Sequence, residues 1–160
     1  MVWQTSAAIA SALSAIVALG VAVYTVRRTL WISAVVALEQ RFSQINHAKI
    51  INPDAWDSIR HDQSLSDTAK HLVFETFQFY HQAFVLNSRG ALSPQDYNQW
   101  SNRLATDIKE FKSYRDWWLN DQKRFHSAWD PTFVQLVTQQ INAVNSANNP
   151  MDRSGGSAAS

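Results

Sequence analysis

The chain opens with a long stretch that contains no charged side chain. Residues 2–26, VWQTSAAIASALSAIVALGVAVYTV, are followed at once by Arg27 and Arg28. A helix rises ~1.5 Å per residue and the hydrocarbon core of a bilayer is ~30 Å thick, so about 20 apolar residues are enough to cross it. Residues 1–28 are therefore predicted to form a retained transmembrane anchor. A cleaved signal peptide would begin with positive charge and have a shorter apolar run.

The two ends of this stretch predict how the anchor is oriented. Trp3 and Tyr24 lie near its ends, where amphipathic aromatic rings favour the membrane interface. Arg27 and Arg28 mark the far edge, and no Lys or Arg precedes the stretch. Positively charged residues accumulate on the cytoplasmic side of membrane proteins. The sequence therefore predicts a single-pass protein of the cell membrane, with its N-terminus outside and its C-terminal domain in the cytoplasm.

One face of the predicted anchor carries small side chains. Ser or Ala recurs at every fourth position, at Ser6, Ala10, Ser14, Ala18 and Ala22. Such a face lets two helix backbones approach closely in lipid, where packing drives helix association. It predicts a helix partner in the bilayer, either a second copy of the chain or another protein. Because Ala also occupies other faces of this stretch, an Ala-rich composition alone is the alternative explanation.

Composition limits the chemistry of the remaining chain. The 160 residues include 14 Lys and Arg against 13 Asp and Glu, and all these charges lie from Arg27 onward. A nucleic-acid-binding protein would need a clearly basic face, so no nucleic-acid partner is expected. The chain has no Cys, which excludes disulfides, thiolate metal sites and cysteine catalysis. Its seven Trp residues give one small domain large side chains to bury.

Helix caps and apolar spacing predict an all-α domain over residues 29–148. A stripe at steps of four and three residues continues the anchor helix: Trp31, Val35, Leu38, Phe42 and Ile45. This stripe either packs on the domain or pairs two copies as a coiled coil. Further helices are expected to begin after polar caps at Asn52, Ser66, Ser93, Ser113 and Asp130. The predicted fold is one transmembrane helix that continues into a cytoplasmic bundle of about five helices.

Two ends of these segments have their own signals. Gly90 follows the helix predicted over residues 66–88 and is expected to adopt a left-handed conformation there. Residues 149–160 are rich in Ser, Gly and Ala and are predicted to form a disordered tail.

Several residues of the domain form a pattern that resembles a group of small uncharacterised bacterial single-pass membrane proteins. The pattern comprises Phe79-Tyr80, Gly90-Ala91-Leu92-Ser93, Tyr97, Trp100, Trp117-Trp118 and Phe125. The resemblance covers roughly residues 1–145. It implies an N-terminal anchor, then a helical domain of unknown function with a Gly-x-Leu-Ser turn and a later Trp pair. It brings no activity that could be transferred to this chain.

The residues that could perform chemistry have simpler explanations. His71 and Glu75 are four apart on helix 66–88 and could face one metal ion, but two ligands do not make a site. A solvated contact between neighbouring helix turns explains the pair equally well. The chain has neither a Gly-x-Ser-x-Gly motif nor a Gly-rich phosphate loop. The sequence therefore predicts no catalytic, cofactor-binding or metal site and no small-molecule substrate.

A partner surface is the more informative candidate. Trp117 and Trp118 are adjacent and so point about 100° apart on a helix, which places one of them off a narrow core stripe. With Arg124 they could form an exposed anchor for another protein. The alternative is a wide apolar face that is buried on two sides.

We expect from these features a membrane-anchored, non-enzymatic interaction or scaffold module, with the bilayer and a protein partner or second copy as its contacts. One alternative is an enzyme or metal protein with its site on helix 66–88. The other is a membrane signal or lipid sensor in which helix 29–45 relays changes in the anchor.

Overall fold

The computed structural model describes the backbone of residues 2–121 and 128–148, and side chains from residue 11 onward within these ranges. The described ranges hold helices and no strand: α1 (Val2–Ile51), α2 (Pro53–Arg60), α3 (Asp67–Ser88), α4 (Pro94–Glu110), α5 (Lys112–Asp121) and α6 (Pro131–Asn148). The predicted all-α class, with a long apolar N-terminal helix that continues into a bundle, is confirmed. The predicted tail over 149–160 lies outside the described residues.

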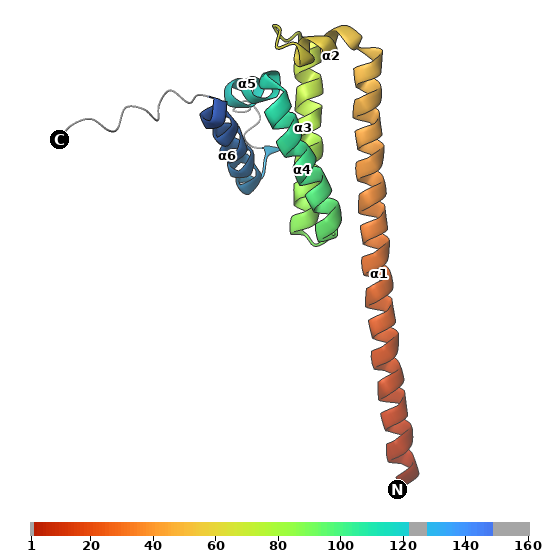
Figure 1. The fold of residues 1–160 in the computed structure, drawn as a ribbon. Helices are drawn as coiled ribbons and strands as arrows, with labels where there is room; N and C mark the ends of the chain where they lie inside the picture. The colour runs from red at the N-terminus through yellow and green to blue at the C-terminus, as the bar shows by residue number, and fades with distance from the viewer. Residues whose placement is uncertain (1, 122–127, 149–160) are drawn as a thin grey trace, which may run out of the picture.

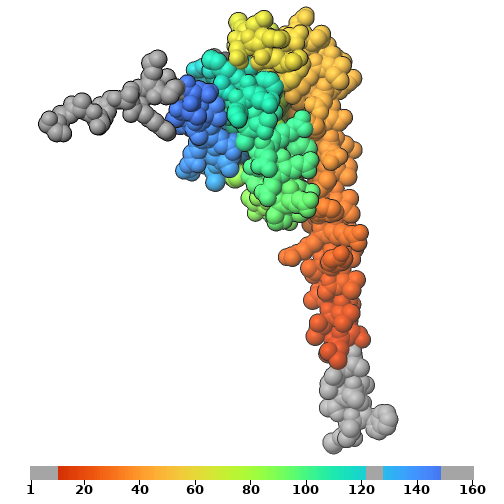
Figure 2. All heavy atoms as spheres, in the orientation of Figure 1, coloured from red at the N-terminus to blue at the C-terminus, as the bar shows by residue number. Residues whose placement is uncertain are grey.

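Helix α1 is unbroken but belongs to the bundle for only part of its length. Its 50 residues span about 75 Å at ~1.5 Å per residue. Every side chain from residue 11 to residue 33 is exposed, and Ala34 is the first buried one. Figures 1 and 2 show the N-terminal part of α1 projecting alone from the base of the bundle. The C-terminal part lies alongside α3.

The predicted stripe is the surface by which α1 docks on the bundle. Leu38 and Ile45 are buried. The ring centroid of Phe42 lies 5.6 Å from that of Phe79 on α3 and 5.4 Å from that of Trp100 on α4. The interpretation that the stripe packs on the domain is therefore confirmed. Because α3 and α4 cover these side chains, the same stripe is not free to pair two copies.

Helix α3 is the centre of the bundle, and its second face packs on α5 and α6. The Phe77 ring centroid lies 4.7 Å from that of Trp118, which in turn lies 5.7 Å from that of Trp129. Phe133 of α6 closes this aromatic core, with its ring centroid 6.0 Å from Trp118. Phe77, Trp118 and Phe133 are completely or almost completely buried. Helix α3 therefore packs against α1 and α4 as well as against α5 and α6.

Most of the predicted caps are present. The Ser66 and Ser93 hydroxyls accept hydrogen bonds from the backbone N–H groups of Ala69 and Asp96, at 3.2 and 3.1 Å. An Asp130 carboxylate oxygen accepts the N–H of Thr132 at 2.8 Å at the start of α6. Gly90 has φ +67°, the left-handed conformation predicted for the end of α3. Asn52 makes no side-chain cap, although Pro53 does open α2.

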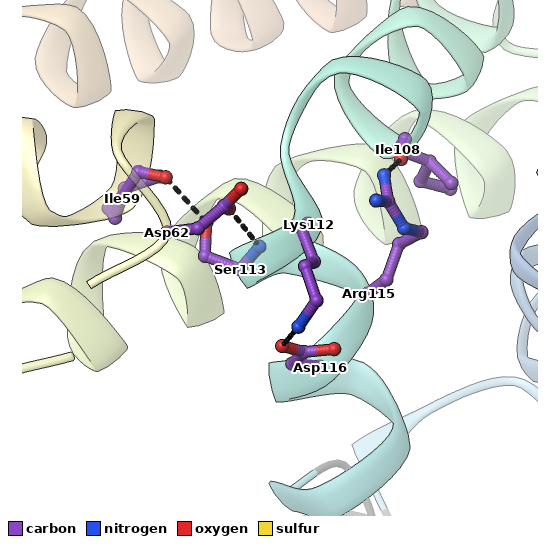
Figure 3. Close-up of polar contacts among 7 residues, drawn as sticks. All are labelled: Ile59, Asp62, Ile108, Lys112, Ser113, Arg115 and Asp116. Carbon is purple, nitrogen blue, oxygen red and sulfur yellow. Dashed lines mark hydrogen bonds and ion pairs between the residues drawn. The ribbon is translucent and has the colours of Figure 1, made fainter. Parts of the chain in front are cut away.

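The prediction for the start of α5 was wrong. This helix begins at Lys112, directly after α4, so Ser113 lies inside its first turn and does not cap it. The cap comes from the α2–α3 turn, where an Asp62 carboxylate oxygen accepts the Ser113 N–H at 3.1 Å (Figure 3). The Ser113 hydroxyl donates to the Ile59 carbonyl at 2.7 Å. A partner 51 residues away in the sequence cannot be identified from local spacing.

The same corner is closed from the other side by Arg115. Its buried guanidinium donates to the Ile108 carbonyl at 2.6 Å (Figure 3). It also donates to the Lys109 carbonyl at 3.0 Å, so the two bonds satisfy the last turn of α4. Asp116, in the same helix, forms an ion pair with Lys112. Side chains rather than a connecting loop therefore hold the bend between α4 and α5.

Candidate functional site

The exposed half of α1 is the most unusual surface of the described residues. Seven large aliphatic side chains in it are each about half exposed or more: Leu13, Ile16, Val17, Leu19, Val21, Val23 and Val26. The hydroxyls of Thr25 and Thr29 donate back to the carbonyls of Val21 and Thr25, at 2.8 and 2.9 Å. Such bonds satisfy polar groups without water. Within the described ranges this is one helix whose length and composition would allow it to cross a membrane.

The predicted interface residues line a crevice at the base of the bundle. Tyr24, Arg27 and Arg28 of α1 lie opposite the turn between α3 and α4. The crevice has a volume of about 580 Å³, and its full lining is Tyr24, Arg27, Arg28, Trp31, Gly90, Leu92 and Ser93. Trp3 belongs to the residues whose side chains are not described. Of the four predicted interface residues, three are thus brought together with a turn that the sequence did not associate with them.

Trp31, which lines this crevice, is hydrogen-bonded to Asp96 of α4. The Trp31 indole Nε1 donates to an Asp96 carboxylate oxygen at 2.9 Å, which ties α1 to the first turn of α4. The Ser93 hydroxyl also donates to Asp96, at 2.6 Å. Both bonds hold the pKa of Asp96 below its usual value, and the bond from Ser93 has the larger effect. Partial burial acts in the opposite direction. The carboxylate is therefore engaged within the protein.

The small-residue face of α1 has no neighbour in the bundle. Ser14, Ala18 and Ala22 are exposed and lie on the projecting part of the helix. Ser6 and Ala10 are outside the described side chains. From Ser14 to Ala22, this face is therefore open to contact from another molecule.

The proposed partner surface at the Trp pair is wrong. Trp117 is 3% exposed and Trp118 is fully buried. Trp117 lies stacked near Phe77, with ring centroids 5.6 Å apart, and the Trp118 indole donates to the Thr138 hydroxyl at 3.2 Å. Both indoles fit because α5 is covered on two sides, by α3 and by α6, which is the alternative that the sequence left open. Arg124 lies outside the described residues.

The pair offered for metal binding is used otherwise. Glu75 forms an ion pair with Arg41 of α1 at 3.0 Å. His71 is exposed, and it lines a groove between α1 and α3 together with Arg41 and Glu75. His81 accepts the backbone N–H of Asp130 at 3.0 Å through its Nε2, and burial lowers its pKa, in keeping with a neutral ring. Over residues 2–121 and 128–148, no three His, Asp or Glu side chains gather as a metal site would require.

A polar cluster that sequence reasoning missed lies where α1, α3 and α4 meet. The Tyr80 hydroxyl donates to an Asp107 carboxylate oxygen at 2.6 Å. Lys49 of α1 and Arg103 of α4 are close enough to act on this carboxylate electrostatically. Burial nevertheless raises the pKa of Asp107, against the opposing effects of the hydrogen bond and the two cations. In the sequence, the only sign of this cluster is the polar hydroxyl of Tyr80 among apolar residues of one helix face. That sign does not identify Asp107 as its partner.

Two cation–π contacts anchor the positive side chains of this cluster. The Lys49 Nζ lies 4.2 Å from the centroid of the Trp56 ring, and the Arg103 guanidinium carbon lies 4.3 Å from that of Phe42. Lys49 and Phe42 both belong to α1, so the cluster holds the C-terminal half of that helix on the bundle. Its arrangement serves docking, since its groups already bind one another.

Comparison of the chain with models of known protein families, with curated proteins and with solved structures gave no match.

Proposed function

We propose that this protein is a membrane-anchored, non-enzymatic helical module that serves as an accessory subunit or scaffold at the cytoplasmic face of the cell membrane. The observation that carries the proposal is α1, whose side chains from residue 11 to residue 33 are all exposed while its C-terminal part packs into the bundle core. A role as a tether follows from this division of one continuous helix.

The energetic argument concerns the side chains from residue 11 to residue 26. Exposed apolar surface costs roughly 25 cal/mol per Å² in water, and this segment exposes it on all sides of the helix. Soluble proteins seldom expose contiguous apolar patches above a few hundred Å². Lipid removes that cost along the whole circumference, whereas a single protein partner would cover one face. The Thr25 and Thr29 hydroxyls donate to backbone carbonyls four residues earlier in the same helix, which also suits an environment without water.

The bundle is assigned to the cytoplasmic side because of Arg27 and Arg28. They directly follow the apolar segment, and positive charge beside a span favours the inner face. Docking through Leu38 and Phe42 then fixes the bundle at a set height above the membrane. A tether of this kind raises the effective concentration of weak contacts, so a modest interface is enough for a scaffold.

The partner is proposed to contact the anchor itself. Ser14, Ala18 and Ala22 present a small-residue face that the bundle leaves open. In lipid such faces associate by close backbone packing. The proposed contact lies within the bilayer, and the bundle lies next to it at the membrane surface.

Location is tested by fractionation of cells that express the full chain. We expect the protein to stay in membranes washed with carbonate, and protease added to intact cells to spare the bundle. Recovery in the aqueous fraction, or digestion of the bundle from outside, would refute the anchor or its orientation respectively.

Association is tested on the detergent-solubilised chain and whatever co-purifies with it. Ala10→Leu with Ala18→Leu should abolish the complex, because added side-chain volume keeps the backbones apart. Ala8→Leu with Ala12→Leu adds the same volume to another face of the helix and should leave the complex intact. Recovery of a monomer without any partner from the unaltered chain would count against the scaffold role.

A further inference from the structure

We propose that the crevice between α1 and the α3–α4 turn binds the phosphate group of an anionic phospholipid from the inner leaflet. This inference rests on the proposed membrane anchor and adds to it a binding site of defined chemistry. Its elements are two arginines that form no ion pair with any residue the structure describes, two amphipathic aromatic rings and a turn that lies at the depth of the headgroups.

The depth follows from the geometry of α1. If the apolar segment ends in the hydrocarbon at Val26, Trp31 lies five residues further, which is about 7.5 Å along the helix axis. The headgroup layer on each side of a bilayer is about 5–8 Å thick, from a total thickness of ~40–45 Å and a hydrocarbon core of ~30 Å. The residues between Val26 and Trp31 therefore lie among the headgroups. So does the turn that faces them across the crevice.

The α3–α4 turn is the part of the bundle that reaches furthest toward the apolar half of α1 (Figure 1). The hydrogen bond from Trp31 to Asp96 holds the turn against α1 at this level. Leu92 forms a buried part of the crevice wall, and Gly90 is exposed at its rim. The bundle therefore contacts the membrane surface at a second place besides the anchor.

The charge of the crevice favours an anion. Among the described residues, Arg27 and Arg28 make no ion pair or side-chain hydrogen bond, and both line the crevice. Arg89, next to Gly90 on the turn, is exposed and adds a third positive charge beside the rim. The Asp96 carboxylate already accepts hydrogen bonds from Trp31 and Ser93, two residues that line the crevice. Guanidinium groups bind phosphate oxygens through paired N–H donors.

A lipid is favoured over a soluble phosphate compound because of the walls. Tyr24 and Trp31 border the crevice on α1, and both ring types prefer the level between hydrocarbon and water. Tyr24 precedes Arg27 by one helix turn on the membrane side, so an acyl chain can leave the crevice along the exposed apolar surface of α1. A soluble anion has no acyl chain that would bury this apolar surface.

Binding is tested with the full chain in mild detergent, titrated with dioleoylphosphatidylglycerol or dioleoylphosphatidylcholine, with native mass spectrometry as the readout. We expect the anionic lipid to bind more tightly than the zwitterionic one. Each arginine near the surface contributes about fivefold, so Arg27→Gln with Arg28→Gln should weaken phosphatidylglycerol binding about twenty-five-fold. Arg60→Gln, at the opposite end of the bundle, removes an exposed arginine of the same kind and should change nothing.

Competition identifies the source of the phosphate. Inorganic phosphate added at the same concentration as the lipid should leave phosphatidylglycerol bound. Displacement by inorganic phosphate would overturn the lipid assignment in favour of a soluble anion. Equal binding of the two lipids would overturn the site altogether and leave the arginines as simple interface residues.

Position is tested separately, and the absence of Cys makes the labelling unambiguous. A nitroxide on Gln95→Cys, in the first turn of α4, should be reached by lipid-soluble oxygen better than by a water-soluble nickel chelate when the chain is in vesicles. The same label on Gln63→Cys, in the α2–α3 turn, should show the opposite preference. A label on Gln95→Cys that behaves like the one on Gln63→Cys would overturn the proposed contact.

These outcomes separate the two proposals. If carbonate washing removes the unaltered protein from membranes, the anchor is wrong, and this site with it. If the protein is retained but shows no preference for phosphatidylglycerol, only the lipid site is wrong. The chain with Arg27→Gln and Arg28→Gln should remain in the membrane, because these substitutions leave the apolar segment unchanged.

Discussion

Replacing Tyr80 with Phe should weaken the docking of α1 through a single hydrogen bond. Tyr80 is 3% exposed, and Phe keeps its ring and therefore its packing. The hydroxyl that is lost donates to the Asp107 carboxylate at 2.6 Å. A hydrogen bond to a charged group contributes about 1.5–3 kcal/mol, so the free energy of unfolding at neutral pH should fall by about 2 kcal/mol. For a domain of this size the melting temperature should fall by roughly 6–10 °C.

The sign of the pH dependence follows from the pKa of Asp107, which the fold raises. A carboxyl with a raised pKa favours the folded state below its ordinary unfolded value, near 3.8, and loses that contribution as pH rises through the folded pKa. The Tyr80 hydrogen bond lowers this pKa, so its removal raises the pKa further. The deficit of Tyr80→Phe should therefore be largest at neutral pH and shrink as the medium approaches pH ~4.

The assay is urea and thermal unfolding of the full chain in mild detergent, followed by near-ultraviolet circular dichroism of the buried Trp residues. Asp107→Asn makes the acceptor neutral, and in that background Tyr80→Phe should cost about 1 kcal/mol or less. The double-mutant cycle then isolates the charged part of the bond. A variant within about 0.5 kcal/mol of the unaltered protein at neutral pH, or a deficit that grows in acid, would refute the assignment of Asp107 as a buried charged acceptor.

Two further substitutions test the docking of α1 and the corner between α4 and α5. Leu38→Ala should lower the free energy of unfolding by about 2–5 kcal/mol, because Leu38 is fully buried. Val36→Ala, on the exposed face of α1, should change it by less than about 0.5 kcal/mol. Equal losses for the two variants in urea unfolding would contradict the packing described. Asp62→Ala removes the cap of α5 and should lower the free energy of unfolding by about 0.5–2 kcal/mol. Asp62→Asn keeps an acceptor oxygen for the Ser113 N–H and tolerates the positive φ of this position, so it should have a smaller effect. A loss of similar size in both variants would contradict the capping role.

Local signals predicted the helices well, because caps and apolar periodicity act within one or two turns. Ser66, Ser93 and Asp130 cap their own helices, and Gly90 takes the left-handed conformation that ends α3. The failure at Ser113 has a physical cause of the same kind. There the acceptor comes from Asp62, and a side chain brought in by the tertiary fold replaces the local cap.

The Trp pair shows the limit of helical-wheel reasoning. A narrow apolar stripe cannot hold Trp117 and Trp118 together, and their spacing suggested that one ring is exposed. The bundle buries both because α5 is covered on two sides. How many neighbours surround a helix is a property of the packed bundle, which the sequence of that helix does not contain.

The sequence by itself determined that the first half of α1 is apolar, that two arginines end this segment, and that a set of capped helices follows. These properties depend on side-chain chemistry and on spacing within a helix, which are local. Only the tertiary structure decided that the α3–α4 turn lies opposite Arg27 and Arg28, and that Asp107 receives its hydrogen bond from Tyr80. Such contacts join residues far apart in the chain, and they form because burial of the apolar faces brings whole helices together.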